Sequence, residues 1–424
     1  MAKNAIVDIT TCWDRPAVAT GKGETYLVVT LTTAKPKKNT RRAAVDVSFV
    51  IDRSGSMTGL PLDLAKQGVI TALDQLNDGD GVSVVAYDHL PATISPLAPA
   101  TSTQRAQLVQ TLRAMETGGS TNLFGGWQLG CEHLTHPEFG VAGRIRRTIL
   151  LTDGLANVGL VDPQQISWQV GRQRQAGITT STLGLGTGID ETLLSGMAEA
   201  GGGNFAFVEH PKDLPAFFAR ELGEALSVVA SSAAITLTLP KGVRARLLNP
   251  FPTERAGKRL SITLGDLPAG MVLDLVFSIT TRAKTEGAFS PLELTAEWKI
   301  AGTDNARPPA PERVTVLINT LMAVSPADFT SMPRDEKASD AVARMIADDA
   351  RRAALQHFRT GDLASARSVL ASAQSFAAAA PLASPELIGE LGAMMDFDPA
   401  SQEFHLRSRQ IENDAHRRSR GRNI

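Results

Sequence analysis

Few residues in this sequence could form disulfide bonds, and no apolar run is long enough to cross a membrane. The 424 residues include only two cysteines, Cys12 and Cys131, which lie far apart in the chain. A low cysteine content of this kind favours two free thiols in a reducing compartment over a framework of disulfide bonds. No stretch reaches the ~18 consecutive apolar residues of a membrane-spanning helix, and the first residues lack the apolar core of a signal peptide. We therefore expect a cytoplasmic protein with no membrane span.

The sequence also lacks the motifs of several enzyme classes. It contains no Gly-x-x-x-x-Gly-Lys-Ser/Thr phosphate loop, no Gly-x-Ser-x-Gly elbow and no His-Glu-x-x-His zinc motif. His133 and His136 are three residues apart, but no cluster of Cys and His residues joins them, which disfavours a zinc site there. The net charge of −1 gives no general attraction to nucleic acid or anionic membranes.

Two basic segments are interpreted as solvated. Residues 35–42 form a linker, with a phosphate-binding patch as the alternative, and residues 407–422 form a tail. The alternative for the tail is a partner-docking or nucleic-acid segment, but no aromatic residues are interleaved there, so no nucleic-acid partner is expected.

From about residue 44, buried strands alternate with amphipathic helices. The predicted strands are 45–51, 82–87, 148–151, 179–185 and 205–208, with a short edge strand around Ile94. The predicted helices are 61–76, 103–115, 123–134, 164–176, 191–200 and 214–229. This alternation predicts an α/β domain with a doubly wound, mostly parallel sheet and right-handed crossovers.

Three polar stretches fall where such a sheet gathers ligands. Asp52, Ser54 and Ser56 follow the buried strand Val45–Ile51, Thr121 lies on a glycine-rich loop, and Asp153 ends another buried strand. Ligands of open parallel sheets bind outside the carboxyl ends of the strands. Hydroxyl oxygens with few carboxylates suit Mg²⁺ better than Zn²⁺. Asp-x-Ser-x-Ser alone is a common kind of polar loop, so the prediction depends on all three stretches.

Together these residues resemble the metal-ion-dependent adhesion site of the von Willebrand factor type A family, also called the integrin I-domain family. The resemblance covers about residues 44–229, and none of the five positions departs from the pattern. It implies a Rossmann-like domain that binds Mg²⁺ or Mn²⁺, with Ca²⁺ as a further possibility. Ser54, Ser56 and Thr121 would be hydroxyl ligands, and Asp52 and Asp153 would bind directly or through water. It also implies one coordination position for a carboxylate of a protein partner.

The flanking segments follow other patterns. Strands are predicted at 4–11 and 24–33, and short strands punctuated by turns are predicted at 234–239, 243–248, 259–264, 271–281, 292–300 and 313–321. This spacing predicts an antiparallel β-sandwich. We expect residues 1–42 and 230–322 to share that sandwich, with the α/β domain of residues 43–229 inserted between them.

Residues 323–424 are expected to be helical. Helices are predicted at 335–360, 362–379, 384–395 and 403–418, with Asp362 as the N-cap of the second. The first two resemble a single tetratricopeptide-type unit. One unit is too few for a solenoid, so we interpret the pair as a cap on the sandwich rather than as a separate peptide groove.

We hypothesise a non-enzymatic, metal-dependent protein-interaction module. The resemblance implies an adaptor or scaffold whose partner supplies an Asp or Glu carboxylate, such as an AAA+ ATPase or an assembly subunit. The alanine-rich organisation indicates a bacterial source. Two alternatives stay open. One is a metal-dependent hydrolase or nuclease, although the motif loops offer no spare general base. The other is a scaffold whose metal is purely structural.

Overall fold

The protein is described from a computed structural model of the 424-residue chain. The described residues are 6–35, 42–135, 144–153, 156–186, 189–208, 210–302, 310–318, 320–382 and 384–398, together with 401, 408, 411, 414 and 421. His136, the predicted helix 403–418 and the basic segments lie wholly or mostly outside these residues.

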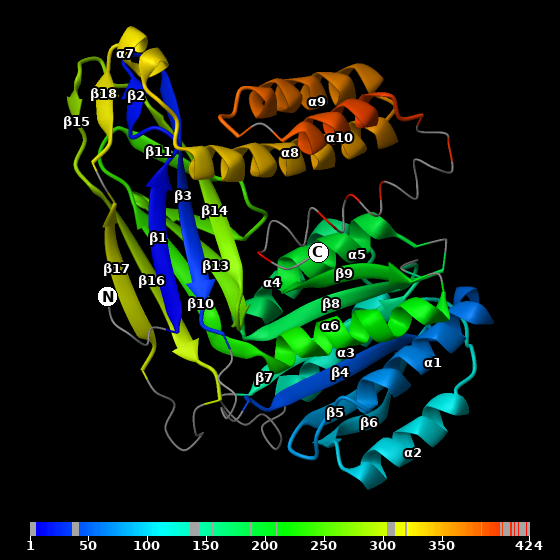
Figure 1. Ribbon diagram of the computed structural model, residues 1–424. Helices are drawn as coiled ribbons and strands as arrows, with labels where there is room; N and C mark the ends of the chain where they lie inside the picture. Colours follow the sequence, from blue (N-terminus) through cyan, green and yellow to red (C-terminus); the bar gives the residue numbers. More distant parts are fainter. Residues whose placement is uncertain are drawn as a thin grey trace.

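A six-stranded, mostly parallel sheet forms the centre of the α/β domain (Figure 1). Its strands, in spatial order, are β6 (Pro91–Pro99), β5 (Gly81–Tyr87), β4 (Val45–Asp52), β7 (Ile145–Thr152), β8 (Ile178–Leu185) and β9 (Gly202–Val208). Every neighbouring pair is parallel except β5 and β6, which form an antiparallel edge. The predicted fold class is confirmed.

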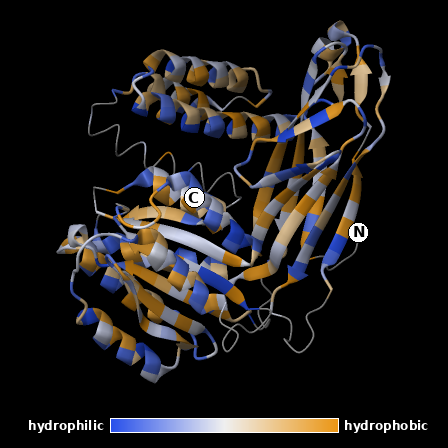
Figure 2. Cartoon of the chain, turned by 180° about the vertical axis from the view of Figure 1, so that it is seen from behind, coloured by the Kyte–Doolittle hydropathy of each residue, from blue (hydrophilic) through white to orange (hydrophobic). Residues whose placement is uncertain are grey.

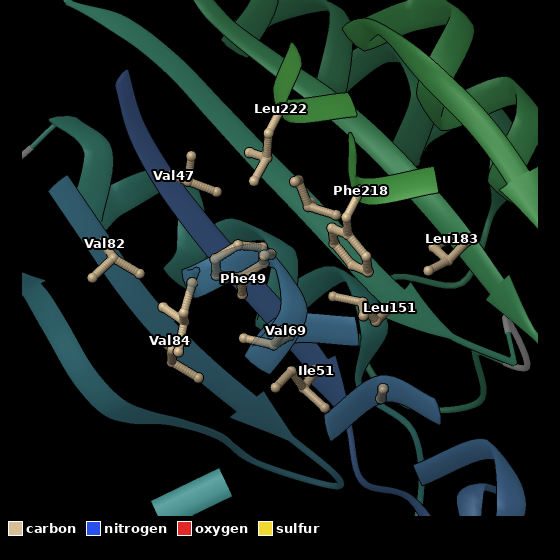
Figure 3. Close-up of a cluster of buried hydrophobic side chains, with 14 of the residues drawn as sticks. Val47, Phe49, Ile51, Val69, Val82, Val84, Leu151, Leu183, Phe218 and Leu222 are labelled. Atoms are coloured by element: carbon tan, nitrogen blue, oxygen red, sulfur yellow. The ribbon is translucent and has the colours of Figure 1, made fainter. Parts of the chain in front are cut away.

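Helices cover both faces of this sheet. On one face lie α1 (Leu60–Leu73) and α6 (Leu214–Leu226), with α2 (Ser102–Arg113) beside α1. On the other lie α3 (Leu123–Thr135), α4 (Pro163–Gln175) and α5 (Glu191–Gly201). Side chains of β4 alternate between the two cores: Phe49 and Ile51 pack with Phe218 of α6 (Figure 3), whereas Val50 faces the α3 side. A strand buried on both faces explains the near-continuous apolar run of β4.

Residues before and after the α/β domain pair in one antiparallel sandwich. One sheet has the order β1 (Val7–Trp13), β3 (Gly23–Thr33), β14 (Val272–Thr281) and β11 (Val243–Leu247). The other has the order β12 (Thr253–Ala256), β13 (Arg259–Pro268), β10 (Val228–Thr238), β16 (Leu292–Ile300) and β17 (Glu312–Ile318). β3 pairs with β14 from Gly23 opposite Thr281 to Thr32 opposite Val272, so the two flanks of the α/β domain share a sheet.

The passage from α6 to the sandwich differs from the sequence prediction. The helix ends at Leu226 rather than Val229, and β10 begins at Val228 rather than Ala234. Ser232 has a positive φ of 54°, and the register of β10 shifts between Ala230 and Ala233 on one side. A bulge of this kind interrupts the period-two pattern from which a strand start is read.

Short elements and a helical unit complete the chain. A small sheet joins β15 (Gly287–Ala288), β18 (Met322–Val324) and β2 (Ala17–Ala19), and α7 (Pro326–Ser331) follows it. Then come α8 (Glu336–Arg359), α9 (Leu363–Ala378) and α10 (Pro385–Met395). In Figure 2 these helices, like the strands of the sandwich, show a mixture of apolar and polar residues. Among the described residues, none of the helices combines the length and apolar composition that a membrane crossing requires.

The helical unit is attached to both other parts of the molecule. Val342 and Met345 of α8 pack with Val28 and Val276 of the sandwich. At the far end of the same helix, Arg359 Nη2 lies 3.2 Å from Glu191 Oε2 at the start of α5. The helical unit therefore bridges the sandwich and the α/β domain (Figure 1).

Candidate metal centre

The five residues predicted to bind metal lie in three loops at the carboxyl edge of the central sheet. Asp52 is the last residue of β4, and Ser54 and Ser56 lie in the turn before α1. Thr121 lies two residues before the start of α3. Asp153 directly follows β7, the strand that pairs with β4. Asp52, Ser54, Thr121 and Asp153 are buried, whereas Ser56 is exposed. The site is thus a mostly buried group of oxygens with one exposed hydroxyl.

Both carboxylate oxygens of Asp52 are held by neighbours. Oδ1 accepts a hydrogen bond from the Ser54 amide at 2.8 Å. Oδ2 accepts hydrogen bonds from the Thr152 hydroxyl at 2.6 Å and the Tyr87 hydroxyl at 3.3 Å. Burial raises the pKa of Asp52, the hydrogen bonds from Thr152 and Ser54 oppose this shift, and the negative charge of Asp153 adds to it. The two carboxylates are therefore close enough to interact, an arrangement that a cation would stabilise.

The loop that carries Thr121 holds the others in place. The Gly118 amide donates to the carbonyl of Arg53 at 2.6 Å, and the Gly55 amide donates to the carbonyl of Gly119 at 2.8 Å. The Asn122 amide donates to the carbonyl of Asp88 at 2.7 Å. A Cβ atom at position 118 would lie only 2.1 Å from Asp88 Oδ2, so the close approach of these loops requires glycine there.

Backbone hydrogen bonds also fix the positions of Thr121 and Asp153. The Thr121 amide donates to Asn157 Oδ1 at 2.8 Å, and the amides of Asn157 and Val158 each donate to the Thr121 carbonyl at 3.1 Å. The Asp190 amide, at the start of α5, donates to the Asp153 carbonyl at 3.2 Å. Together with the contacts of Gly118, Gly55 and Asn122, these hydrogen bonds join five loops at this edge before any ligand binds.

The donor set fits a hard divalent cation. Ser54 Oγ and Ser56 Oγ lie 3.2 Å apart, close to the ~3 Å between adjacent ligands of an octahedral Mg²⁺ bound at ~2.1 Å. Within the part of the chain that the structure describes, no three His, Cys, Asp or Glu side chains gather in a group that could hold a metal. A cation at this edge would therefore rely on hydroxyl oxygens and the two carboxylates, a set that disfavours zinc.

Sequence reasoning missed the residues that orient these ligands. Tyr87, Thr152 and Asn157 contact Asp52 or Thr121, yet none belongs to the motif. Tyr87 and Thr152 could have been suspected because both end buried strands next to β4. No sequence signal identifies Asn157, which lies 36 residues from its partner in an irregular loop.

Two further polar side chains, His133 and Asp80, have structural partners of their own. His133 Nε2 lies 3.0 Å from Thr93 Oγ1, on the edge strand β6. Asp80, in the turn before β5, accepts hydrogen bonds from Arg42 at 2.6 and 2.8 Å. Both lie away from the carboxyl edge of the central strands.

Comparison with known proteins agrees with this architecture. The von Willebrand factor type A domain family matches residues 46–220. The uncharacterized protein YfbK of Escherichia coli strain K12 is 28% identical over 292 residues, which cover 65% of this chain and 48% of YfbK. The chain spans about half the length of the curated relatives it matches.

Two solved structures share the fold over nearly the whole chain. A von Willebrand factor type A protein from Catenulispora acidiphila has a TM-score of 0.68 at 18% identity. The superposition covers 100% of this chain and 99% of the Catenulispora chain. The ArnB paralog VWA2 from Sulfolobus acidocaldarius has a TM-score of 0.64 at 14% identity, with 98% and 99% covered. At these identities the likeness concerns the fold alone. Residues 46–220 of this chain are a von Willebrand factor type A domain, and members of that family are protein-interaction modules that often depend on a divalent metal.

Proposed function

We propose that this chain is a non-enzymatic, metal-dependent protein-interaction module. Its ligands for Mg²⁺, Mn²⁺ or Ca²⁺ would be Asp52, Ser54, Ser56, Thr121 and Asp153. When bound, the cation supplies a coordination position that an Asp or Glu carboxylate of a partner can occupy. The observation that carries the proposal is the 3.2 Å approach of the two serine hydroxyls beside the oriented Asp52 carboxylate.

The surrounding residues would make this recognition rigid. Thr152 and Tyr87 fix the Asp52 carboxylate, and Asn157 fixes the backbone of Thr121. A preorganised site loses little conformational freedom on binding, so more of the interaction energy remains as affinity. A single carboxylate contact can then be both directional and strong.

One observation favours a second candidate function, a metal-dependent hydrolase. His89 Nδ1 lies 2.9 Å from Asp88 Oδ1, at the same edge as the motif loops, and a carboxylate that orients a histidine is a common arrangement for a general base. However, the His89 side chain is 62% exposed, whereas catalytic sites are usually enclosed. A hydrolase would lose turnover of phosphoester or peptide substrates in His89→Ala, whereas an interaction module would keep partner binding.

The wider setting is also part of the proposal. We propose an intracellular bacterial protein; the two free cysteines, Cys12 and Cys131, support the intracellular setting. The resemblance supports a role as an adaptor or scaffold for an AAA+ ATPase or another assembly subunit. We assign residues 43–229 to the metal-binding domain, 1–42 and 230–322 to the sandwich, and 323–424 to the helical region, which could serve as a second docking surface.

A pull-down from a lysate of the source organism tests this function. The bait would be the full chain in Mg²⁺, the full chain in EDTA, and the Asp52→Ala and Asp153→Ala variants in Mg²⁺. Asp74→Ala, at the opposite end of α1, is the matched control because it removes an exposed carboxylate from the same domain. A protein retained only by the wild type and the control in Mg²⁺ supports the proposal. A protein retained in every lane assigns the interaction to the sandwich or the helices and contradicts it.

A further inference from the structure

Exposed apolar side chains gather at the metal-binding edge. Leu60 is 53% exposed, Leu90 is 63% exposed and Val161 is 46% exposed. Leu60 begins α1 after β4, Leu90 lies in the turn after β5, and Val161 lies between β7 and α4. These three strands are consecutive neighbours in the sheet and end at the same edge. Three exposed apolar side chains thus lie on loops at the edge where the carboxylate of a partner would enter.

All three side chains are borne by loops tied to the Thr121 loop. The loop before Leu60 is joined to it through Gly55 and Gly119, the turn of Leu90 through Asp88 and Asn122, and the loop of Val161 through Asn157 and Thr121. Single exposed apolar residues need no explanation, but three on separate loops around one site indicate an interaction surface.

Three polar side chains at this edge, those of Arg53, Asp88 and His89, contact one another. Arg53 Nη2 lies 2.9 Å from Asp88 Oδ2, and His89 Nδ1 lies 2.9 Å from Asp88 Oδ1. Beside these contacts, Leu60, Leu90 and Val161 offer large exposed apolar side chains to an occupant of the metal site. An occupant complementary to this face carries one negative charge for the cation, with apolar side chains beside it.

We propose that Leu60, Leu90 and Val161 form an apolar rim that selects a partner segment in which an Asp or Glu is flanked by large apolar residues. This inference rests on the proposed function, because the metal provides the contact for the acidic residue. Partial burial of one leucine is worth roughly a tenfold change in affinity. The rim would therefore discriminate strongly between acidic segments that a bare metal site would bind alike.

A random peptide library displayed on phage and selected on the full chain in Mn²⁺ tests the rim. The variants are Leu60→Ser/Leu90→Ser and Asp153→Ala. Leu317→Ser/Leu363→Ser is the matched control, because both of its leucines are exposed and lie on β17 and α9. Titration calorimetry with Mn²⁺ alone shows whether each variant keeps the metal.

The expected result is enrichment of peptides with an acidic residue flanked by apolar residues, bound at least roughly tenfold more weakly by Leu60→Ser/Leu90→Ser and equally by the control. The rim variant should bind Mn²⁺ like the wild type.

Enrichment of acidic peptides without apolar neighbours overturns the rim but not the metal-dependent function. Enrichment that survives in EDTA or in Asp153→Ala, or no enrichment at all, overturns both. A concentration-dependent dimer abolished by Leu60→Ser/Leu90→Ser would also overturn the proposal, because a second copy would then cover the rim.

Discussion

Arg147 of β7 and Glu221 of α6 form a fully buried ion pair, with Arg147 Nη1 2.7 Å from Glu221 Oε1. Glu221 Oε1 also accepts a hydrogen bond from Ser181, and Oε2 accepts one from Asn204, at 2.6 and 2.7 Å. Burial lowers the pKa of Arg147, but the neighbouring carboxylates, Glu221 first, raise it by more. Arg147 thus stays charged, and the pair attaches the last helix of the domain to three strands of the sheet.

Removal of one member of this pair should destabilise the domain strongly. Glu221→Gln leaves a buried guanidinium without its nearest counter-charge, which typically costs ~3–5 kcal/mol. Arg147→Met should cost a comparable amount, and the double variant should cost clearly less than the sum. Equilibrium urea unfolding followed by the fluorescence of Trp127, which is buried in the same domain, measures this. Strictly additive losses would show that the two side chains are not coupled.

The same arginine shows where sequence reasoning fails. The apolar run 148–151 predicts a strand that begins after Arg147, yet β7 begins at Ile145 and buries Arg147. A charged residue is interpreted as exposed unless its partner is known, and Glu221 lies 74 residues further along the chain. Local signals performed better: Asp362 caps α9 as predicted, accepting a hydrogen bond from the Ser365 amide at 3.1 Å.

The residues of the candidate site likewise fall into those that local sequence signals identify and those that they do not. Asp52, Ser54, Ser56, Thr121 and Asp153 were identifiable because their spacing and their places after buried strands are local features. Their role as ligands stays a prediction. The groups that orient them could not be read from the sequence, because Thr152 contacts Asp52 across 100 residues and Asn157 contacts Thr121 across 36. Such pairs depend on strand order, which the sequence pattern leaves open.

Gly118→Ala should weaken metal binding. The new methyl group would lie 2.1 Å from Asp88 Oδ2, so the Thr121 loop or Asp88 must move. Changes to groups that orient metal ligands typically cost ~10–100-fold in affinity. Mn²⁺ calorimetry measures the effect.

Gly171→Ala is its control. A Cβ at Gly171, inside α4, meets no atom within 4 Å, so this change should leave metal binding intact and stabilise the helix by ~0.5–1 kcal/mol. Unaltered Mn²⁺ affinity in Gly118→Ala would contradict the proposed role of the loop.

Asn157 should act as a positioning residue for Thr121. Asn157→Ala removes the acceptor for the Thr121 amide, and we expect a roughly 10–100-fold loss in Mn²⁺ affinity. Because Asn157 is exposed, stability should fall by only ~1 kcal/mol. Asn157→Asp keeps an acceptor oxygen and should retain the affinity. Equal affinity losses in both variants would contradict the role, because the acceptor would then not matter.

The two thiols should differ in reactivity. Burial raises the pKa of Cys131 to about 12, and partial desolvation of the thiol together with the charge of Asp335 raises the pKa of Cys12 to about 11. Because the thiolate is the reactive form, a disulfide reagent at pH 8 should modify the exposed Cys12 slowly and Cys131 only after denaturation. Two thiols should titrate in denaturant without reductant. Rapid modification of Cys131 in the native chain would show that the α3 side of the core opens readily.

Asp80 should make the stability of the domain depend on acid pH. Burial would raise the pKa of its carboxyl, but Arg42 and the amides of Asn77 and Val45 lower it overall. A carboxyl whose pKa is lower in the folded state contributes stability above its unfolded pKa of ~3.9, and this contribution disappears as the pH falls through the folded value. Asp80→Asn should therefore cost ~1–3 kcal/mol at pH 7 and progressively less below pH ~4.

Urea unfolding of wild type and Asp80→Asn between pH 2 and pH 7 measures this convergence. Asp78→Asn is the matched control, since its side chain is 72% exposed and its contact to Arg105 is long, at 3.4 Å. The control should track the wild type at every pH, because an exposed pair contributes little. Asp80 lies before β5, at the edge opposite the candidate metal centre, so Mn²⁺ affinity at pH 7 should be the same in all three proteins. A difference between wild type and Asp80→Asn that persisted at pH 2 would mean that the side chain stabilises the turn through its shape rather than its charge.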